Sequence, residues 1–412
     1  MHPDHRDAER SLPAEHAGTA GEVFAAFLRL GVTSFGGPVA HLGYFHDDLV
    51  MRRKWLDEKT YVDLVALSQF LPGPASSKVG IAIGLSRAGY LGALAAWAGF
   101  TMPSAIALVL FGYGVTSLGN ALGSGWLHGL KVAAVAVVAN AVLTMMRSLT
   151  PDRERATLAA MAAALVLAIP SSFGQIIAIA LGGVVGLLLF RGMPVERHTA
   201  LPHPVSRNAA LAAIALFFGV LIGLPLIGSA LHSHPLDLLN AFYRAGSLVF
   251  GGGHVVLPLL QAAVVPPGWV SNDTFLAGYG ATQAVPGPLF TFSAYLGTVM
   301  GPTPNGWLGA ALCLFAMFLP AFLLVIGPMP FWDSLRRESW AQAALRGVNA
   351  AVVGLLLAAL YNPVWTSGIT DAGDFALGVI AFLLLFMWKT PPWLVVAFCA
   401  LGGAVIAFLP SH

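Results

Sequence analysis

Residues 67–74 read LSQFLPGP, and residues 281–288 read ATQAVPGP. Both octapeptides contain Gln-x-x-Pro-Gly-Pro, and each lies in an apolar stretch long enough for a membrane helix. Proline lacks a backbone N–H and clashes with the preceding turn, so each motif ends one helix and lets another begin. The sequence therefore predicts two membrane segments broken in the same way. The residues of the breaks are Pro72, Gly73, Pro74, Pro286, Gly287 and Pro288.

The composition is typical of a membrane protein. Hydrophobic residues make up 57% of the 412 residues and charged residues only 10%, against about 25% charged in soluble domains. Apolar runs of about 17–25 residues recur, and each can cross the core of a lipid bilayer. We therefore expect an all-α polytopic membrane protein. A net charge of +2 gives no reason to expect a nucleic-acid partner.

The chain contains an internal repeat. AFLRLGVTSFGG (26–37) matches AFYRAGSLVFGG (241–252), and GLKVAAV (129–135) matches GVNAAVV (347–353). Shared composition explains matching Leu and Ala, but not Arg, Gln, Trp and Pro-Gly-Pro in the same order. We expect a disordered cytoplasmic tail (1–20), a first repeat (21–190), a linker with one unpaired membrane helix (191–235, helix 208–231) and a second repeat (236–409).

About thirteen membrane segments are expected. Those of the first repeat lie near 22–50, 60–87, 90–117, 126–148, 155–170 and 174–190, and those of the second near 237–262, 273–301, 306–330, 341–362, 373–388 and 391–409. The unpaired segment 208–231 changes the orientation of everything that follows it.

The loop charges indicate that the two repeats have opposite orientations. Loops 51–59, 147–155 and 191–207 are rich in Lys and Arg, whereas loops 255–272 and 363–372 have none. Because Lys and Arg concentrate in cytoplasmic loops, we expect inverted-topology repeats, an arrangement found in secondary transporters. The amino terminus is then cytoplasmic and the carboxyl terminus periplasmic.

Segments 22–50 and 60–87 each break near the middle into pieces of roughly a dozen residues, which suit re-entrant hairpins better than full spans. With two hairpins in each repeat, nine of the segments cross fully and every basic loop is cytoplasmic. Full crossing by all thirteen segments is the alternative.

The helices that begin after the breaks predict an anion site. Their first N–H groups have no partner within the helix and carry partial positive charge. Ser76, Ser77, Thr291 and Ser293 add hydroxyl donors, and Lys78 adds a charge in one repeat only. Gly36, Gly37, Gly251 and Gly252 let the backbone approach either a ligand or a neighbouring helix, and both interpretations stay open.

Arg29 and Arg244 lie at matching places in two apolar segments. An arginine in the membrane interior costs at least ~2.5–3.5 kcal/mol, and the recurrence favours function over snorkelling to the interface. We expect the two side chains to converge near the midplane and to hold a compact oxyanion of charge −2, which guanidinium groups bind bidentately.

Other polar residues carry weaker hypotheses. Gln69 and Gln283 could bond ligand oxygens or the carbonyls freed by the breaks. Lys131, His41, His254 and Asp63 are candidates for ion coupling, although Lys131 could also lie at the membrane edge, the histidines could be packed polar residues, and Asp63 could pair with an arginine or face water.

The sequence argues against an enzyme. It has no carboxylate pair, Ser-His-Asp set, metal-ligand spacing or nucleotide loop, and Cys313 and Cys399 both lie in apolar runs. We expect no cofactor and no metal site. The oligomeric state stays open, with a homodimer among the alternatives.

Several motifs resemble the chromate ion transporter family, in its long form with both repeats in one chain. They are SFGGP (34–38), MRRKWLDEKTYVDL (51–64), SQFLPGPASSKVGIAIG (68–84), FGGGHVVLP (250–258) and TQAVPGP (282–288). The resemblance implies an inner-membrane antiporter that exports chromate using the proton motive force and confers chromate resistance, with thirteen membrane segments. Transport of sulfate or another oxyanion, or inward transport, is the first alternative, and a membrane scaffold or enzyme is the second. Lys78 faces Phe292 in the alignment of the repeats, and Pro38 faces Gly253, so two equal anion sites are not expected.

Overall fold

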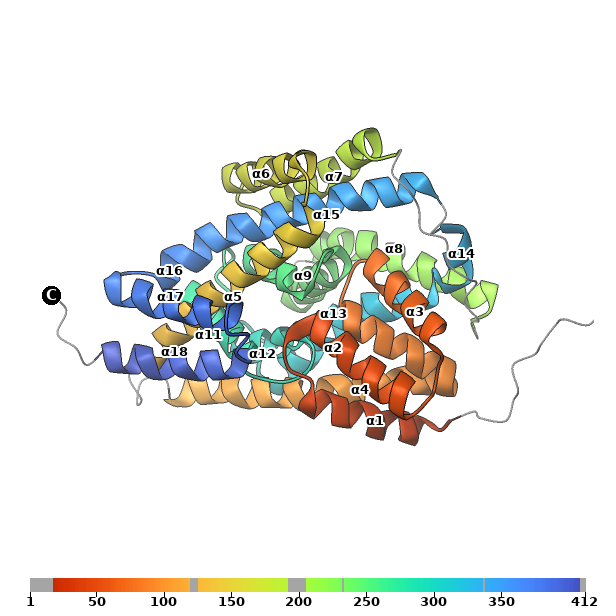
Figure 1. Cartoon of the computed structure of the whole chain (residues 1–412), viewed down its shortest axis with the longest axis horizontal. Coiled ribbons are helices and arrows are strands. Elements are labelled where there is room, and N and C mark those ends of the chain that lie inside the picture. The colour runs from red at the N-terminus through yellow and green to blue at the C-terminus, as the bar shows by residue number, and fades with distance from the viewer. Residues whose placement is uncertain (1–17, 119–124, 192–204, 232, 336–337, 408–412) are drawn as a thin grey trace, which may run out of the picture.

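The computed structural model describes residues 18–118, 125–191, 205–231, 233–335 and 338–407 (Figure 1). Within these ranges every regular element is a helix. The expectation of an all-α chain is therefore confirmed, whereas the expected tail at residues 1–20 lies almost wholly outside the described residues.

The first repeat begins with two broken segments. Its elements are α1 (Ala20–Thr33), α2 (Gly37–Phe45) with its π-helical extension η2 (His46–Arg52), α3 (Glu58–Phe70), α4 (Ala75–Leu118), α5 (Gly125–Leu149), α6 (Arg153–Ala168) and α7 (Ser172–Leu189). Side-chain caps fix several of the starts: Asp57 accepts from the N–H of Thr60, and Asp152 from that of Arg155.

The unpaired helix α8 (Arg207–Leu231) leads to a second repeat of the same design. Its elements are α9 (His234–Leu248), η3 (Gly253–Val255), α10 (Val256–Val264), α11 (Asn272–Thr282), η4 (Leu289–Thr291), α12 (Phe292–Val299), α13 (Gly306–Ile326), η5 (Met329–Phe331), α14 (Trp332–Leu335), α15 (Ser339–Ala359), η6 (Leu360–Trp365), α16 (Thr366–Gly368), α17 (Ala372–Phe386) and α18 (Pro392–Ile406).

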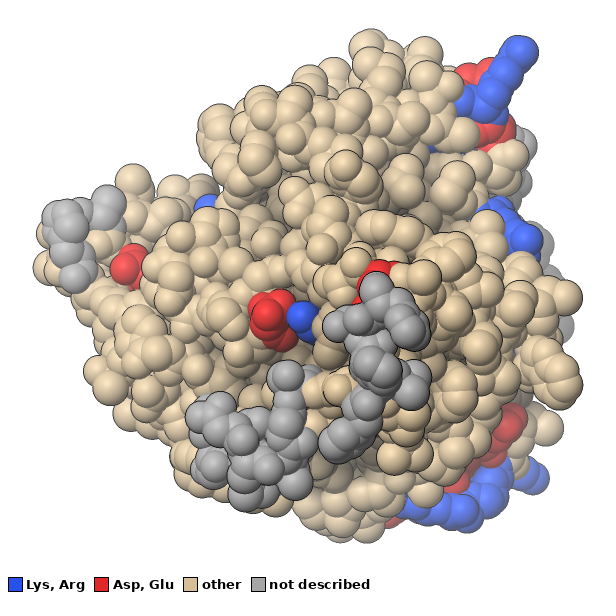
Figure 2. Space-filling view, turned by 90° about the vertical axis from the view of Figure 1, so that its left-hand side faces the viewer, with Lys and Arg blue, Asp and Glu red and all other residues tan. Residues whose placement is uncertain are grey.

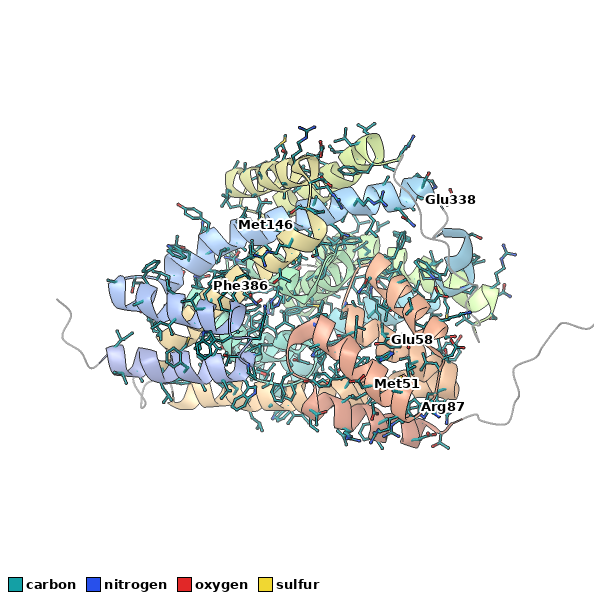
Figure 3. All side chains as sticks on the ribbon, in the orientation of Figure 1. Met51, Glu58, Arg87, Met146, Glu338 and Phe386 are labelled. Atoms are coloured by element: carbon teal, nitrogen blue, oxygen red, sulfur yellow. The ribbon has the colours of Figure 1, made fainter. Side chains whose placement is uncertain are left out.

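The broken segments of the first repeat fold back on themselves. The rings of Phe27 and Phe45 are 5.4 Å apart, although a straight helix would separate residues this distant in sequence by about 27 Å. The guanidinium of Arg87 likewise lies 5.1 Å from the ring of Trp55, across the second segment. Figure 3 shows Glu58 and Arg87, which flank this second hairpin, at the same end of the molecule.

The second repeat has the same two hairpins. The His234 and Trp269 rings are 4.8 Å apart across the first, and the Tyr295 hydroxyl donates to the carbonyl of Thr274 at 2.9 Å across the second. All four segments therefore fold back on themselves, as the hairpin prediction requires, because full crossings would hold these partners far apart.

Long apolar helices make up most of the remaining structure. Six are long and apolar enough to cross a membrane, namely Ala75–Val115, Gly125–Leu149, Ser172–Leu189, Arg207–Gly228, Gly306–Phe331 and Ser339–Gly368, and α17 and α18 are shorter apolar helices. The first of the six turns sharply at Ala88 and Gly89, so its first part completes a hairpin and its second part is the crossing. Few charged side chains interrupt the face in Figure 2, and the Lys and Arg residues gather near its right-hand edge. The chain is a multi-pass membrane protein.

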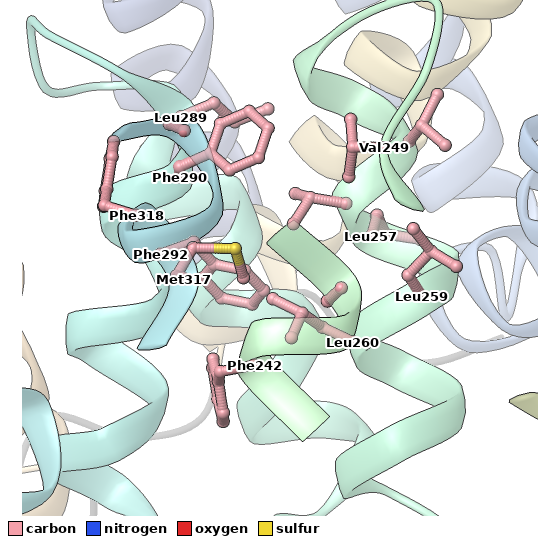
Figure 4. Packing of buried hydrophobic residues seen from close by; sticks show 14 of the residues in the cluster. Phe242, Val249, Leu257, Leu259, Leu260, Leu289, Phe290, Phe292, Met317 and Phe318 are labelled. Carbon is pink, nitrogen blue, oxygen red and sulfur yellow. The ribbon is translucent and has the colours of Figure 1, made fainter. Parts of the chain in front are cut away.

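The two repeats pack by exchanging their last pair of helices. Helices α6 and α7 of the first repeat lie along α15 of the second, and α17 and α18 lie along α5 of the first (Figure 1). The packing of α1 on α4 is likewise matched by that of α9 on α13. Figure 4 shows part of the core around the second repeat's hairpins, where the rings of Phe290 and Phe318 are 6.1 Å apart. The repeats are therefore two halves of one body.

Candidate functional site

The hairpin tips of the two repeats are joined by a matched pair of backbone hydrogen bonds. The N–H of Gly73 donates to the carbonyl of Val249 at 2.6 Å, and that of Gly287 donates to the carbonyl of Ser34 at 2.9 Å. We call these contacts the two cross-repeat clamps. Each connects the Pro-Gly-Pro break of one repeat to the first break of the other, so both repeats are needed to form the centre of the protein.

Only glycine fits at the centre of each break. Gly73 and Gly287 have φ of 102° and 96°, in the left-handed region that favours glycine. A Cβ at Gly287 would also lie 2.9 Å from the Ser104 hydroxyl, and one at Gly73 would lie 3.2 Å from the carbonyl of Gly246. The breaks are therefore closely packed as well as bent.

A cavity of about 100 Å³ lies beside the Gly287 clamp, and we call it the junction cavity. Its volume is large enough for several water molecules. The first repeat contributes the start of α2 and part of α5, and the second contributes both its hairpin tips and the turn between α17 and α18. The lining residues are Gly36, Gly37, Pro38, Val137, Asn140, His254, Thr282, Gln283, Val285, Gly287, Leu289, Leu385 and Pro392.

The cavity wall offers neutral polar groups. Helix α2 starts there without a side-chain cap, so the N–H of Gly37 has no partner within the helix, whereas the next residue, Pro38, has no N–H. The Gln283 amide nitrogen is buried and makes no hydrogen bond, and the amide of Asn140 is nearby on α5. No Lys, Arg, Asp or Glu lines the cavity among the described residues. The arrangement can bind an anion through hydrogen bonds and helix dipoles.

His254 is the titratable residue of the wall. Its Nδ1 is 2.7 Å from the hydroxyl of Tyr279, a fully buried residue of α11. Tyr279 is held in turn by edge-on ring contacts with Phe292 and with His254 itself. The orientation of the imidazole is therefore set by the second hairpin of the same repeat.

The structure does not bring Arg29 and Arg244 together. Arg29 is 58% exposed, with Nη1 3.8 Å from Oδ1 of Asp48, because α1 turns Ala26, Phe27 and Leu30 toward the core instead. Arg244 is partly buried in a separate hollow of about 10 Å³ that α7, α9 and α10 line. Neither arginine lines the junction cavity in this conformation.

Lys78 is fully buried but bonds the backbone. Its Nζ donates to the carbonyls of Leu71 and Pro72, at 2.5 and 2.9 Å. These are carbonyls that the break leaves without helical partners. At the aligned position of the second repeat, Phe292 packs against aromatic rings.

The predicted hydroxyl donors have local partners or none. Thr291 and Ser293 donate to the carbonyls of Pro288 and Phe290, both at 2.8 Å. The Ser76 hydroxyl is 3.2 Å from Nδ1 of the buried His41, and the Ser77 hydroxyl is buried without a hydrogen bond. All four lie outside the cavity lining.

The other predicted residues are dispersed. Gln69 is exposed and Asp63 is buried in α3. Lys131 pairs with the exposed Asp273 at 3.0 Å. Gly251 and Gly252 flank Met145 of α5.

The structure thus gathers Gly36, Gly37, His254, Gln283 and Gly287 into one site. Sequence reasoning missed Asn140, Thr282 and Tyr279. For Asn140 a signal existed, since it is the one polar residue of the run VAAVAVVANAVL (132–143).

Comparison with known proteins gives one consistent result. A family model described as "Chromate transporter" matches residues 21–187 and again residues 236–404, once in each repeat. The chain is 30% identical to a chromate transport protein of Pseudomonas aeruginosa, over 95% of this chain and 93% of that one. It is 27% identical to a probable chromate transport protein of Synechococcus elongatus, over 97% and 99% of the two chains. A chromate transport protein of Cupriavidus metallidurans is 27% identical over 94% and 93%. No solved structure matches. Since the family model covers both repeats and the relatives align over nearly their whole length, the chain belongs to the chromate transporter family.

Proposed function

We propose that this protein is a secondary active transporter that carries chromate, a tetrahedral oxyanion of charge −2, outward across the bacterial inner membrane. The support comes from the relatives named as chromate transport proteins, which align with more than nine-tenths of the chain. The inverted repeats remain part of the proposal, because they provide two related conformations that expose one site alternately to the two sides.

The junction cavity is the proposed anion site, and its position is the observation that supports this assignment best. It lies where an uncapped helix start of one repeat meets the Pro-Gly-Pro break of the other. Any motion that separates the repeats at the Gly287 clamp would therefore open or close the site. The start of α2 and the side chains of Asn140 and Gln283 would donate hydrogen bonds to the anion oxygens.

Arg29 and Arg244 have a role in this proposal that differs from that of the cavity residues. Arg29 and Arg244 lie away from the cavity here, so we propose that they contact the anion in another state of the cycle. Replacing either by alanine should then abolish transport while leaving chromate binding in this conformation intact.

Chromate accumulation in a chromate-sensitive bacterium tests the function. Cells that express the protein should accumulate less chromate than cells with an empty vector, and Gln283→Ala should restore most of the accumulation. A hydrogen bond to a charged ligand is worth about 1.5–3 kcal/mol, so its loss weakens binding about 10- to 100-fold. The aligned Gln69 is exposed and outside the cavity, so Gln69→Ala is the matched control.

Unchanged accumulation with normal amounts of protein in the membrane would refute chromate export. Sulfate has the same shape and charge as chromate and is the main alternative substrate. Competition between the two anions in proteoliposomes decides which is preferred, and imposing pH and voltage gradients separately there identifies the driving force.

A further inference from the structure

A bound dianion would need positive charge from the wall of the junction cavity. A dianion that leaves water for a low-dielectric site loses much hydration free energy, and hydrogen bonds from neutral donors offset only part of that loss. The lining offers neutral amides and a helix start but, among the described residues, no lysine or arginine. The one lining residue whose side chain can acquire a positive charge is His254.

The environment of His254 suits two protonation states. Its Nδ1 is 2.7 Å from the Tyr279 hydroxyl, which leaves Nε2 as the ring nitrogen available to the cavity. A hydroxyl can donate a hydrogen bond or accept one, so Tyr279 satisfies Nδ1 whether or not that nitrogen carries a proton. A carboxylate in the same place would instead favour the charged imidazole permanently.

Among the described residues that line the cavity with His254, none is a lysine, arginine, aspartate or glutamate. Helix α11 presents Tyr279, η4 presents Leu289, and α5 presents Val137 and Asn140. Further along α5, Lys131 is already paired with Asp273. The charge of the site therefore depends on the imidazole alone.

The arrangement occurs in one repeat only. In the alignment of the repeats, Val39 stands at the position of His254 and Val65 at that of Tyr279. The other buried histidine of the hairpins, His41, bonds Ser76 and lies outside the cavity lining. Among the described residues, the histidine–tyrosine pair at the junction cavity is therefore a feature of the second repeat.

We propose that the junction cavity binds its oxyanion together with one proton, which His254 takes up and Tyr279 positions. With Nδ1–H donating to the Tyr279 oxygen, Nε2 accepts a proton that comes from the buffered solvent and then donates a hydrogen bond to the anion. This inference rests on the proposed anion site and specifies the charge of the bound complex. The dianion and the proton together carry one net negative charge. Since the bound state carries the extra proton, anion affinity rises as pH falls and declines as pH rises.

Calorimetry on the purified full-length protein tests the proposal. Chromate is titrated at mildly alkaline pH, where it is already the dianion, in two buffers with different heats of ionisation. The difference between the observed heats gives the number of protons taken up per bound chromate. The wild-type protein should take up about one.

Variants assign the proton. His254→Gln should take up none and should bind chromate about 10- to 100-fold more weakly, because a charged hydrogen bond is lost. Tyr279→Phe keeps the packing of the ring but removes the acceptor for Nδ1–H, so proton uptake should fall well below that of the wild type. A purely structural role for Tyr279 would leave the proton count unchanged. His46→Gln is the matched control, because His46 pairs with Glu58 on the surface, far from the cavity lining.

The possible outcomes distinguish failure of proton-linked binding from failure of the proposed anion site. If wild-type protein binds chromate without taking up a proton, or if His41→Gln rather than His254→Gln loses the uptake, this inference is wrong and the proposed function stands. If wild-type protein binds no chromate at any pH, the anion site itself is refuted. If His254→Gln does not fold, the loss of proton uptake in Tyr279→Phe and its retention in His41→Gln decide the question.

Discussion

Lys78 is fully buried. Its side-chain nitrogen donates to the carbonyls of Leu71 and Pro72, which the first Pro-Gly-Pro break leaves without helical partners. An unsatisfied buried polar group costs about 1–3 kcal/mol. Lysine here therefore stabilises the end of α3, and we infer a structural rather than a ligand-binding role in this conformation.

Replacing Lys78 by methionine should lower the stability of the protein by several kcal/mol, because two buried carbonyls lose their donor at once. Thermal unfolding of detergent-solubilised protein, followed by size-exclusion chromatography, measures the effect. Lys131→Met is the control: Lys131 is itself only 12% exposed, but its partner Asp273 is 72% exposed and stays hydrated without the lysine, so the loss should be about 0–1 kcal/mol. Equal melting temperatures for the two variants would contradict the assignment.

The sequence predicts part of the role of Lys78. Side chains on a helix tilt toward its amino terminus, so a lysine in the first turn after Pro-Gly-Pro reaches back to the break. The sequence could not decide between a ligand and a carbonyl as its target, because that depends on whether the break faces a cavity. For Arg29 the missing information was similar, since Asp48 becomes its partner only once the hairpin folds back.

At the scale of elements, the sequence predicted the breaks and the hairpins well. Pro and Gly act locally, and the short apolar pieces leave few alternatives. The sequence did not predict that α7 packs on α15 and α18 on α5. Nearly every face of these helices is apolar, so hydrophobic pattern does not identify the partner.

Glycine allows those exchanged contacts. Gly347 of α15 packs directly on Gly182 and Gly186 of α7, and the aligned Gly129 of α5 packs on Cys399 and Gly403 of α18. In each case a Cβ would overlap the facing backbone. The matched segments GLKVAAV and GVNAAVV thus both begin with a helix-crossing glycine.

Replacing Gly347 by valine should separate α15 from α7 and destabilise the protein by at least about 1–3 kcal/mol, the usual cost of overpacking. The yield of monodisperse protein and its melting temperature would show this. Gly183 is the neighbouring control, because a Cβ there would meet Val348 at an ordinary contact distance of 3.4 Å. A Gly347→Val protein as stable as Gly183→Ala would show that the close crossing is not needed.

At the scale of the whole molecule, the structure shows two related halves, while their opposite orientation in the membrane stays a prediction from loop charges. The halves differ where function is proposed. The first repeat has the polar Ser34, His41 and Ser76 at its hairpin tips, and the aligned residues of the second are Val249, Val256 and Phe290. These three polar residues of the first repeat nevertheless lie outside the lining of the junction cavity, which forms at the Gly287 clamp. The sequence could not predict this, because it depends on how the hairpin tips meet.

Cysteine labelling tests the opposite orientation. Cys313 and Cys399, which are both buried, are first replaced by alanine. One cysteine is then introduced at Lys59 or at Pro267, which are exposed residues in equivalent regions of the two repeats. If the repeats are inverted, a membrane-impermeant thiol reagent added to intact cells should label position 267 and not position 59. Inside-out vesicles should give the reverse pattern and serve as the control for reactivity. Labelling of both positions from the same side would mean that the repeats are parallel. The unpaired helix α8 would then have to return to the side from which it started, and alternating access through inverted repeats would have no structural basis.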